Sequence, residues 1–208
     1  MSATSFPAVL KLELTPEQKD WVSRYLVETR DAVVGSVTGF TAPEWEFKTD
    51  AGRWSIADIL EHLVLVEDAI NGNVRCIDDA PDAPSEWVPA QVDHFILTEI
   101  PKRPAYVADS TSVRKNPLPS GICPTNRWSG DEALALFVDK RNQNLQMVGG
   151  LSQRGRVIAH PVCGPWDGYQ WLLAAGAHCS RHVGQIREVK EDKGFPTAAS
   201  TTSVLPVE

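Results

Sequence analysis

The chain has 208 residues and a formal net charge of −7, from 20 Lys and Arg against 27 Asp and Glu. Its 42% hydrophobic and 23% charged residues are typical of a globular protein and exclude a collagen, a coiled-coil rod and a wholly disordered chain. The acidic balance argues against nucleic acid as a partner, and no apolar run approaches the ~18 residues that span a membrane. We therefore expect one cytoplasmic domain over residues 1–208 that acts on a small molecule.

Each of the first two predicted helices begins at a capping box, in which two side chains three residues apart bond to each other's backbone N–H groups. The first begins at Thr15 and ends near Gly35. The second begins at Ser55 and continues to Gly72 or a turn or two beyond. A period of 3.6 residues predicts a buried stripe on each helix. The stripe of the first contains Trp21, Val22, Tyr25, Leu26, Ala32 and Val33, and that of the second contains Ile56, Ile59, Leu60, Leu63, Val66 and Ile70.

Two further helices follow the same rules. One begins at Ser129 and stops at Gly149, and the last begins at Asp167 and stops at Lys193, just before a glycine. The helices and their connections give a core of about residues 15–195, in which 35–53 is a linker, and a loose tail over 197–208.

A crossover of residues 78–128 joins the second and third helices and holds eight of the 15 prolines, so it cannot be one long helix. We expect a short helix from Gln91 to Ile100, and extended chain across the bundle through Pro104, Pro117, Pro119 and Pro124. Four long helices without alternating strand patterns predict an all-α four-helix bundle. A crossover this long allows an order other than up-down-up-down.

Histidine spacing points to a metal site. His178 and His182 stand one helical turn apart, facing the core beside Trp171, so both imidazoles can bind one ion. His62, at the edge of the second helix's apolar stripe, is the natural third ligand. Three imidazoles with one open position form the ligand set of a catalytic zinc or similar divalent site.

Other polar residues have more than one interpretation. Glu67 and Arg141 fall within apolar stripes, where they either form a buried ion pair or extend past the bundle edge to solvent. His160, just before the last helix, either packs locally or lines the site. Cys179 points about 100° away from His178 and suits core packing better than metal binding. No general acid, base or nucleophile can be assigned, so the catalytic residues are unknown.

Two segments, WSIADILEHLVLVED at 54–68 and HPVCGPWDGYQWLLAAGAHCSRHVGQI at 160–186, resemble the DinB/YfiT-like superfamily of metal-binding four-helix bundles. The similarity covers about residues 15–195. It implies a bundle of DinB-like type in which His62, His178 and His182 bind one divalent ion, usually zinc or nickel, with Gln185 following the histidine pair.

The reactions of the family are diverse. Its characterised members include thiol-dependent transferases and isomerases and proteins described as metal-dependent hydrolases. The resemblance therefore implies a thiol S-transferase or a hydrolase, with a low-molecular-weight thiol as co-substrate in the first case.

Two hypotheses of function remain open. Three core-facing histidines favour a metal-dependent enzyme. A rich aromatic set favours a non-enzymatic bundle that binds a small apolar ligand or dimerises: Trp21, Trp54, Trp128, Trp166 and Trp171. A homodimer is compatible with either hypothesis, and nothing in the sequence fixes it.

Overall fold

The computed structural model of the protein describes residues 12–102 and 120–196. Four long helices form a bundle, as predicted: α1 (Pro16–Val37), α3 (Ile56–Arg75), α5 (Gly130–Val148) and α6 (Gly168–Lys190). None of the helices in these ranges is both long enough and apolar enough to cross a membrane.

All four predicted capping boxes are present. In each, the N-cap side chain accepts a hydrogen bond from the backbone N–H three residues later, and the side chain of that later residue accepts one from the N-cap backbone N–H. The pairs are Thr15 with Gln18, Ser55 with Asp58, Ser129 with Glu132 and Asp167 with Gln170. The predicted helix starts are confirmed. The ends are less accurate, since α1 continues to Val37 and α6 stops at Lys190.

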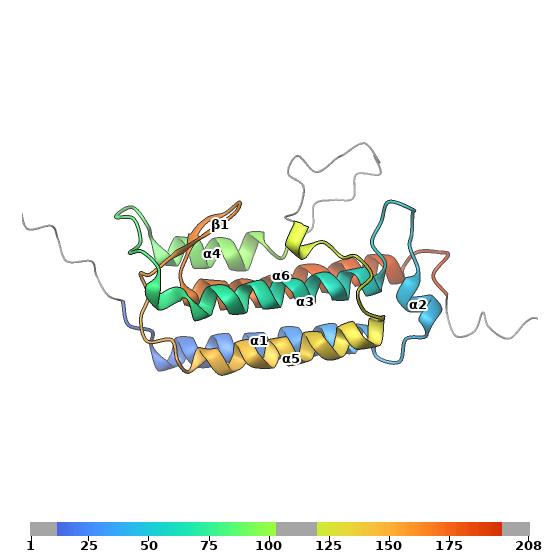
Figure 1. Ribbon diagram of the computed structural model, residues 1–208, viewed down its shortest axis with the longest axis horizontal. Helices are drawn as coiled ribbons and strands as arrows, with labels where there is room; N and C mark the ends of the chain where they lie inside the picture. Colours follow the sequence, from blue (N-terminus) through green and yellow to red (C-terminus); the bar gives the residue numbers. More distant parts are fainter. Residues whose placement is uncertain (1–11, 103–119, 197–208) are drawn as a thin grey trace, which may run out of the picture.

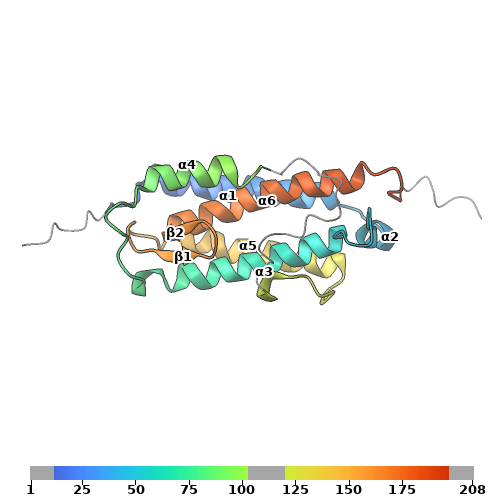
Figure 2. The same ribbon diagram turned by 90° about the horizontal axis from the view of Figure 1, so that it is seen from above.

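Each long helix has two neighbours in the bundle (Figures 1 and 2). α1 packs beside α5 and α6, and α3 packs beside the same two helices from the other side. α3 and α5 run in one direction while α1 and α6 run in the other, so the order is not up-down-up-down (Figure 1). The long connection between α3 and α5 makes this order possible, because it returns the chain along the bundle.

Part of the predicted crossover can be followed. It contains α4 (Pro89–Glu99), close to the predicted short helix, and α4 packs on α6 (Figure 1). Pro124 lies in the loop that leads to α5. The extended run through Pro104, Pro117 and Pro119 falls outside the described residues, as does the 197–208 tail.

A buried arginine fixes α4 to the bundle. Arg154 donates to both carboxylate oxygens of Asp93 on α4, at 2.7 and 2.8 Å, and to Asp167 at the start of α6, at 2.6 Å. Gln170 adds a 2.9 Å bond to Asp93. These charge-assisted bonds join the crossover to the N-terminus of α6.

Five short elements within the described residues were not predicted. Two are the 3₁₀ helices η1 (Ile77–Asp79) and η2 (Ser120–Ile122). The segment taken as a linker contains the short helix α2 (Ala42–Glu46), and a two-stranded antiparallel hairpin precedes α6, formed by β1 (Ile158–His160) and β2 (Gly164–Trp166). Strands of three residues are too short to show alternation in a sequence. The turn between them depends on Gly164 at φ +86°, a conformation that favours glycine.

The buried face of α1 is narrower than predicted. Trp21 and Ala32 lie at the surface, where Trp21 stacks on Tyr25. Thr29 and Val37 are buried in their place. Thr29 is acceptable in the core because its hydroxyl accepts a hydrogen bond from Arg141 and donates to the α1 backbone.

A polar network crosses the centre of the bundle. Arg141 of α5 and Glu67 of α3 form a bidentate pair at 2.5 and 3.1 Å, with side chains 0% and 1% exposed. Arg141 also donates to the carbonyls of Leu26 on α1 and Ala175 on α6. The alternative that both side chains reach solvent is therefore wrong, and this pair connects all four long helices.

Gly176 sets the closeness of α1 and α6. A Cβ at this position would lie 2.5 Å from Cε1 of Tyr25, whereas a Cβ at Gly72 would meet open space. We expect Gly176→Ala to lower the free energy of unfolding by about 1–3 kcal/mol through overpacking. Gly72→Ala is the control and should raise it by about 0.5–1 kcal/mol. Urea denaturation measures both, and a Gly176→Ala variant as stable as wild type would contradict the close packing.

Candidate metal centre

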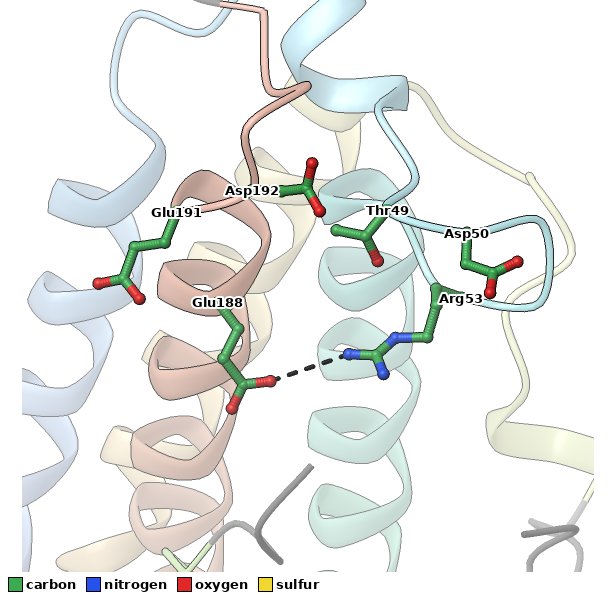
Figure 3. Close-up of a pocket in the computed structure, with 6 residues that line it drawn as sticks. All are labelled: Thr49, Asp50, Arg53, Glu188, Glu191 and Asp192. Carbon is green, nitrogen blue, oxygen red and sulfur yellow. Dashed lines mark ion pairs between the residues drawn. The ribbon is translucent and has the colours of Figure 1, made fainter. Parts of the chain in front are cut away.

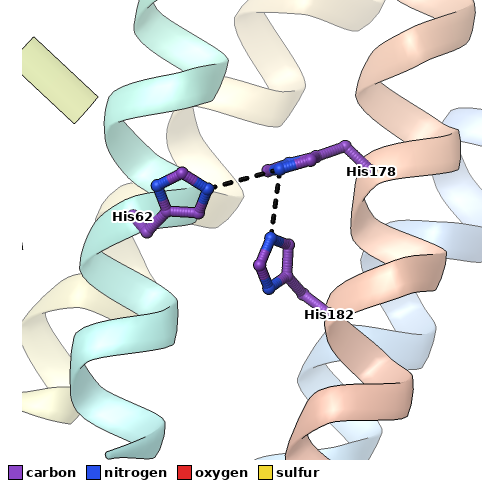
Figure 4. Close-up of side chains that lie close together, drawn as sticks. All are labelled: His62, His178 and His182. Atoms are coloured by element: carbon purple, nitrogen blue, oxygen red, sulfur yellow. Dashed lines mark hydrogen bonds between the residues drawn. The ribbon is translucent and has the colours of Figure 1, made fainter. Parts of the chain in front are cut away.

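Three imidazole rings meet between α3 and α6 (Figure 4). His62 comes from α3, and His178 and His182 come from successive turns of α6. The Nε2 atom of His178 lies 3.3 Å from Nε2 of His62 and 3.0 Å from Nε2 of His182. Within the described ranges, these are the side chains in which three or more potential ligand atoms converge, all within 4.8 Å of one another.

The spacing of the nitrogens suits a small divalent ion. A tetrahedral ion with metal–nitrogen bonds of about 2.0–2.1 Å holds its ligand nitrogens about 3.3–3.4 Å apart. The two Nε2 separations, 3.3 and 3.0 Å, need only small ring movements to match. Three ligands from the protein would leave a fourth position for water or a substrate.

Hydrogen bonds at the outer nitrogens orient two of the rings. Nδ1 of His62 lies 2.7 Å from the carbonyl oxygen of Ile122, and because a carbonyl only accepts, this nitrogen carries the hydrogen. Nδ1 of His182 lies 2.9 Å from Oε1 of Gln185 and donates in the same way. Both Nε2 atoms are thereby left with a lone pair directed at the cluster, the arrangement found around metal-binding histidines.

The environment of His178 favours its uncharged ring. His62 and His182 are buried, at 3% and 4% exposure, and His178 is partly buried. Burial, followed by the neighbouring His182 and His62, holds the pKa of His178 well below its usual range. A neutral imidazole is the form that binds a metal ion, so His178 needs no deprotonation at neutral pH.

The other predicted pocket residues divide into two groups. Gln185 contacts the cluster through His182. Trp171 and His160 pack with Trp166 in a separate aromatic group, with ring centroids 4.1 Å apart for His160 and Trp166. The Nδ1 atom of His160 accepts hydrogen bonds from two backbone N–H groups of the hairpin. Of the two interpretations of His160, the structure therefore shows local packing.

Glu67, Arg141 and Cys179 bond to one another. The Glu67–Arg141 pair forms the core network described above, and Arg141 donates to Sγ of Cys179 at 2.9 Å. Burial raises the pKa of the Cys179 thiol to about 12. A raised pKa keeps this thiol protonated at neutral pH, whereas the thiolate is the form that attacks a substrate or binds a metal. The predicted core-packing role therefore fits Cys179 better.

Glu61 and Ile122 were not predicted. Glu61 precedes His62 and is 1% exposed, and its carboxylate binds the loop that carries Ile122. The sequence offered one signal, a carboxylate next to His62 in a segment, 59–65, whose other five residues are apolar. The contribution of Ile122 has no signal at all, because any residue supplies a backbone carbonyl.

A hollow of about 330 Å³ lies at the end of the bundle where α6 finishes (Figure 3). Four carboxylates line it, together with Thr49 and Arg53, which pairs with Glu188 at 3.9 Å. Among the described residues, the carboxylate oxygens of this hollow do not come as close to one another as the histidine nitrogens do. The histidine cluster is therefore the better candidate for a functional site.

The fold and the cluster define a class: a four-helix bundle with three histidines gathered from two helices. The family model described as the DinB superfamily matches residues 25–186, and the chain belongs to this superfamily.

Two similar proteins come from Bacillus subtilis. The uncharacterized protein YuaE of strain 168 is 25% identical over 167 residues, which cover 79% of this chain and 94% of YuaE. The structure of YfiT superposes with a TM-score of 0.51 and 17% identity over 94% of each chain. YfiT is described as "a probable metal-dependent hydrolase with an unusual four-helix bundle topology". At this identity the likeness supports the fold alone.

Proposed function

We propose that the protein is a divalent-metal-dependent enzyme of hydrolase type that acts on a small molecule, with zinc or nickel as the metal. The observation that carries the proposal is the convergence of three Nε2 atoms, two of them oriented by hydrogen bonds at Nδ1. The description of YfiT as a metal-dependent hydrolase supports the same reaction class.

The roles of the protein's residues follow from this geometry. A divalent ion bound by three imidazoles lowers the pKa of water at its open position toward neutrality and polarises a substrate carbonyl or phosphoryl group. His62, His178 and His182 hold the ion, while Ile122 and Gln185 keep two of the rings in the tautomer that binds it. Trp54 packs against His62, with ring centroids 4.9 Å apart, and adds an apolar wall beside that ligand.

Thiol transfer is the second reaction that we propose to test. Thiolate sulfur is a ligand that zinc accepts readily. The cysteine next to His178 in sequence is turned into the core, with its Sγ against Arg141, so it does not supply that ligand. An external low-molecular-weight thiol could then bind at the open position.

The open position can be tested without knowing the substrate. Protein loaded with Co²⁺ should change its visible spectrum on addition of azide or a small thiol, because three protein ligands leave a site for either. A spectrum that neither alters would indicate a closed structural site and would contradict the enzyme proposal.

The reaction class is tested by a panel of ester, amide and thiol-transfer assays on protein purified without nickel resin. We expect turnover that disappears after chelation, returns with the metal and is absent from His178→Ala. His94→Ala, which removes an exposed histidine of α4, is the control and should keep full turnover. Full ligand binding by chelated protein, without turnover, would instead favour the non-enzymatic binding module.

A further inference from the structure

Glu61 binds the loop that ends the crossover. Its Oε1 accepts the backbone N–H of Thr125 at 2.9 Å, and its Oε2 accepts the backbone N–H of Arg127 at 3.1 Å. The Arg127 guanidinium and the Thr125 hydroxyl add bonds to Oε1 at 3.1 and 3.5 Å. A carboxylate that is 1% exposed is thus held by four donors from one loop.

The loop makes a turn between its two bound residues. Asn126, between the two bound residues, has φ +59°, in the left-handed region that asparagine tolerates better than most residues. This turn lets the N–H groups of Thr125 and Arg127 reach the same carboxylate. Without that carboxylate, two backbone donors and a left-handed residue would lose the contact that compensates them.

The same loop carries the carbonyl that orients His62. Ile122 lies three residues before Thr125, and its oxygen accepts from Nδ1 of His62 at 2.7 Å. Consecutive residues of α3 therefore bind the two ends of the segment 122–127, Glu61 at one end and His62 at the other. A loop displaced from Glu61 would take the Ile122 carbonyl away from the imidazole.

We propose that Glu61 is a positioning residue for the metal centre, which sets the tautomer and orientation of His62 by holding the 122–127 loop on α3. The inference rests on the proposed metal binding at the three histidines. Metal binding at Nε2 makes the Nδ1 hydrogen a stronger donor, and an ordered acceptor at Nδ1 strengthens the metal bond in return. Because this coupling is reciprocal, the ion and the seated loop should stabilise each other to the same extent.

The test compares Glu61→Gln and Glu61→Ala with wild type. Gln keeps the shape of Glu, but one of its two oxygens is replaced by an NH₂ group. That group would face a backbone N–H donor of Thr125 or Arg127 without being able to accept from it. The dissociation constant for Zn²⁺ is measured by competition with a chromophoric chelator. Since loss of an outer-shell partner typically weakens metal binding 10–100-fold, we expect about tenfold weaker binding in Glu61→Gln and more in Glu61→Ala.

A second readout separates positioning from simple loss of stability. In Co²⁺-loaded protein the Nδ1 hydrogen of His62 should give a shifted proton resonance that exchanges slowly with solvent. In the Glu61 variants this resonance should exchange faster or vanish, while the resonance of His182, held by Gln185, persists. The wild-type amides of Thr125 and Arg127 should also exchange more slowly when Zn²⁺ is bound.

Asp93→Ala is the matched control, because it releases another part of the crossover, α4, from Arg154 without touching the loop at His62. We expect it to lower stability and leave the Zn²⁺ dissociation constant within twofold of wild type. Wild-type affinity in the folded Glu61→Gln variant, or an equal loss in Asp93→Ala, would overturn the inference. Failure of the wild-type protein to bind Zn²⁺ would instead overturn the proposed function.

Discussion

His178→Ala is expected to reduce Zn²⁺ affinity at least about 100-fold, more than an outer-shell change usually does. The Nε2 atom of His178 is the one within 3.3 Å of both other ring nitrogens, so its removal leaves two ligands from different helices. A 100-fold loss corresponds to about 2.8 kcal/mol of binding free energy. Competition titration of metal-free protein measures it directly.

The same loss should be visible in thermal unfolding. An ion that binds only the folded state stabilises it by about 2.7 kcal/mol when present at 100 times its dissociation constant. Zn²⁺ should therefore raise the melting temperature of wild type and of the His94→Ala control, and leave that of His178→Ala nearly unchanged. An equal rise in the melting temperature of all three proteins would show that Zn²⁺ binds at a site other than the three histidines.

Arg141→Met should destabilise the fold by about 3–5 kcal/mol, because it leaves the Glu67 carboxylate buried without its partner. The Leu26 and Ala175 carbonyls lose a donor in the same change, which adds to the loss. Urea denaturation with a chelator present measures the effect without any contribution from bound metal.

The chain offers a matched control one residue away. Lys140 pairs with Asp68 at 2.5 Å on the bundle surface, with side chains 27% and 61% exposed. Lys140→Met should cost less than about 1 kcal/mol, the usual size for an exposed pair. The double variant Glu67→Leu with Arg141→Met should be less destabilised than the sum of its single changes. Each single change leaves one buried charge without its partner, whereas the double variant removes both charges. A loss below about 1 kcal/mol in Arg141→Met would show that the core pair is not needed.

The bundle could be predicted because its signals are local. A capping box needs only two side chains three residues apart, and a stripe needs only a period of 3.6 residues. The hairpin before α6 and the short helix α2 escaped prediction, because elements of three and five residues have no usable period. The face of α1 was misjudged at Trp21, since an aromatic residue on a stripe edge can stack at the surface as well as pack inside.

The candidate site was predictable to the extent that side chains define it. His178 and His182 are adjacent on any helix, and His62 was placed by its position on a second apolar stripe. The groups that bond to the Nδ1 atoms of these rings differ in how far they could be predicted. Gln185 lies one turn from His182, whereas the carbonyl of Ile122 comes from 60 residues beyond His62, and only the fold brings it there. The same reason hid Glu61, whose partners lie 64 and 66 residues away.

The central claim is that His62, His178 and His182 bind one divalent ion. Anomalous diffraction above and below the Zn absorption edge, from crystals of protein purified without nickel resin and supplied with Zn²⁺, tests it most directly. We expect one strong peak per chain, about 2.0–2.1 Å from each of the three Nε2 atoms. An empty cluster in protein saturated with Zn²⁺, or a peak bound only at other residues, would contradict the claim.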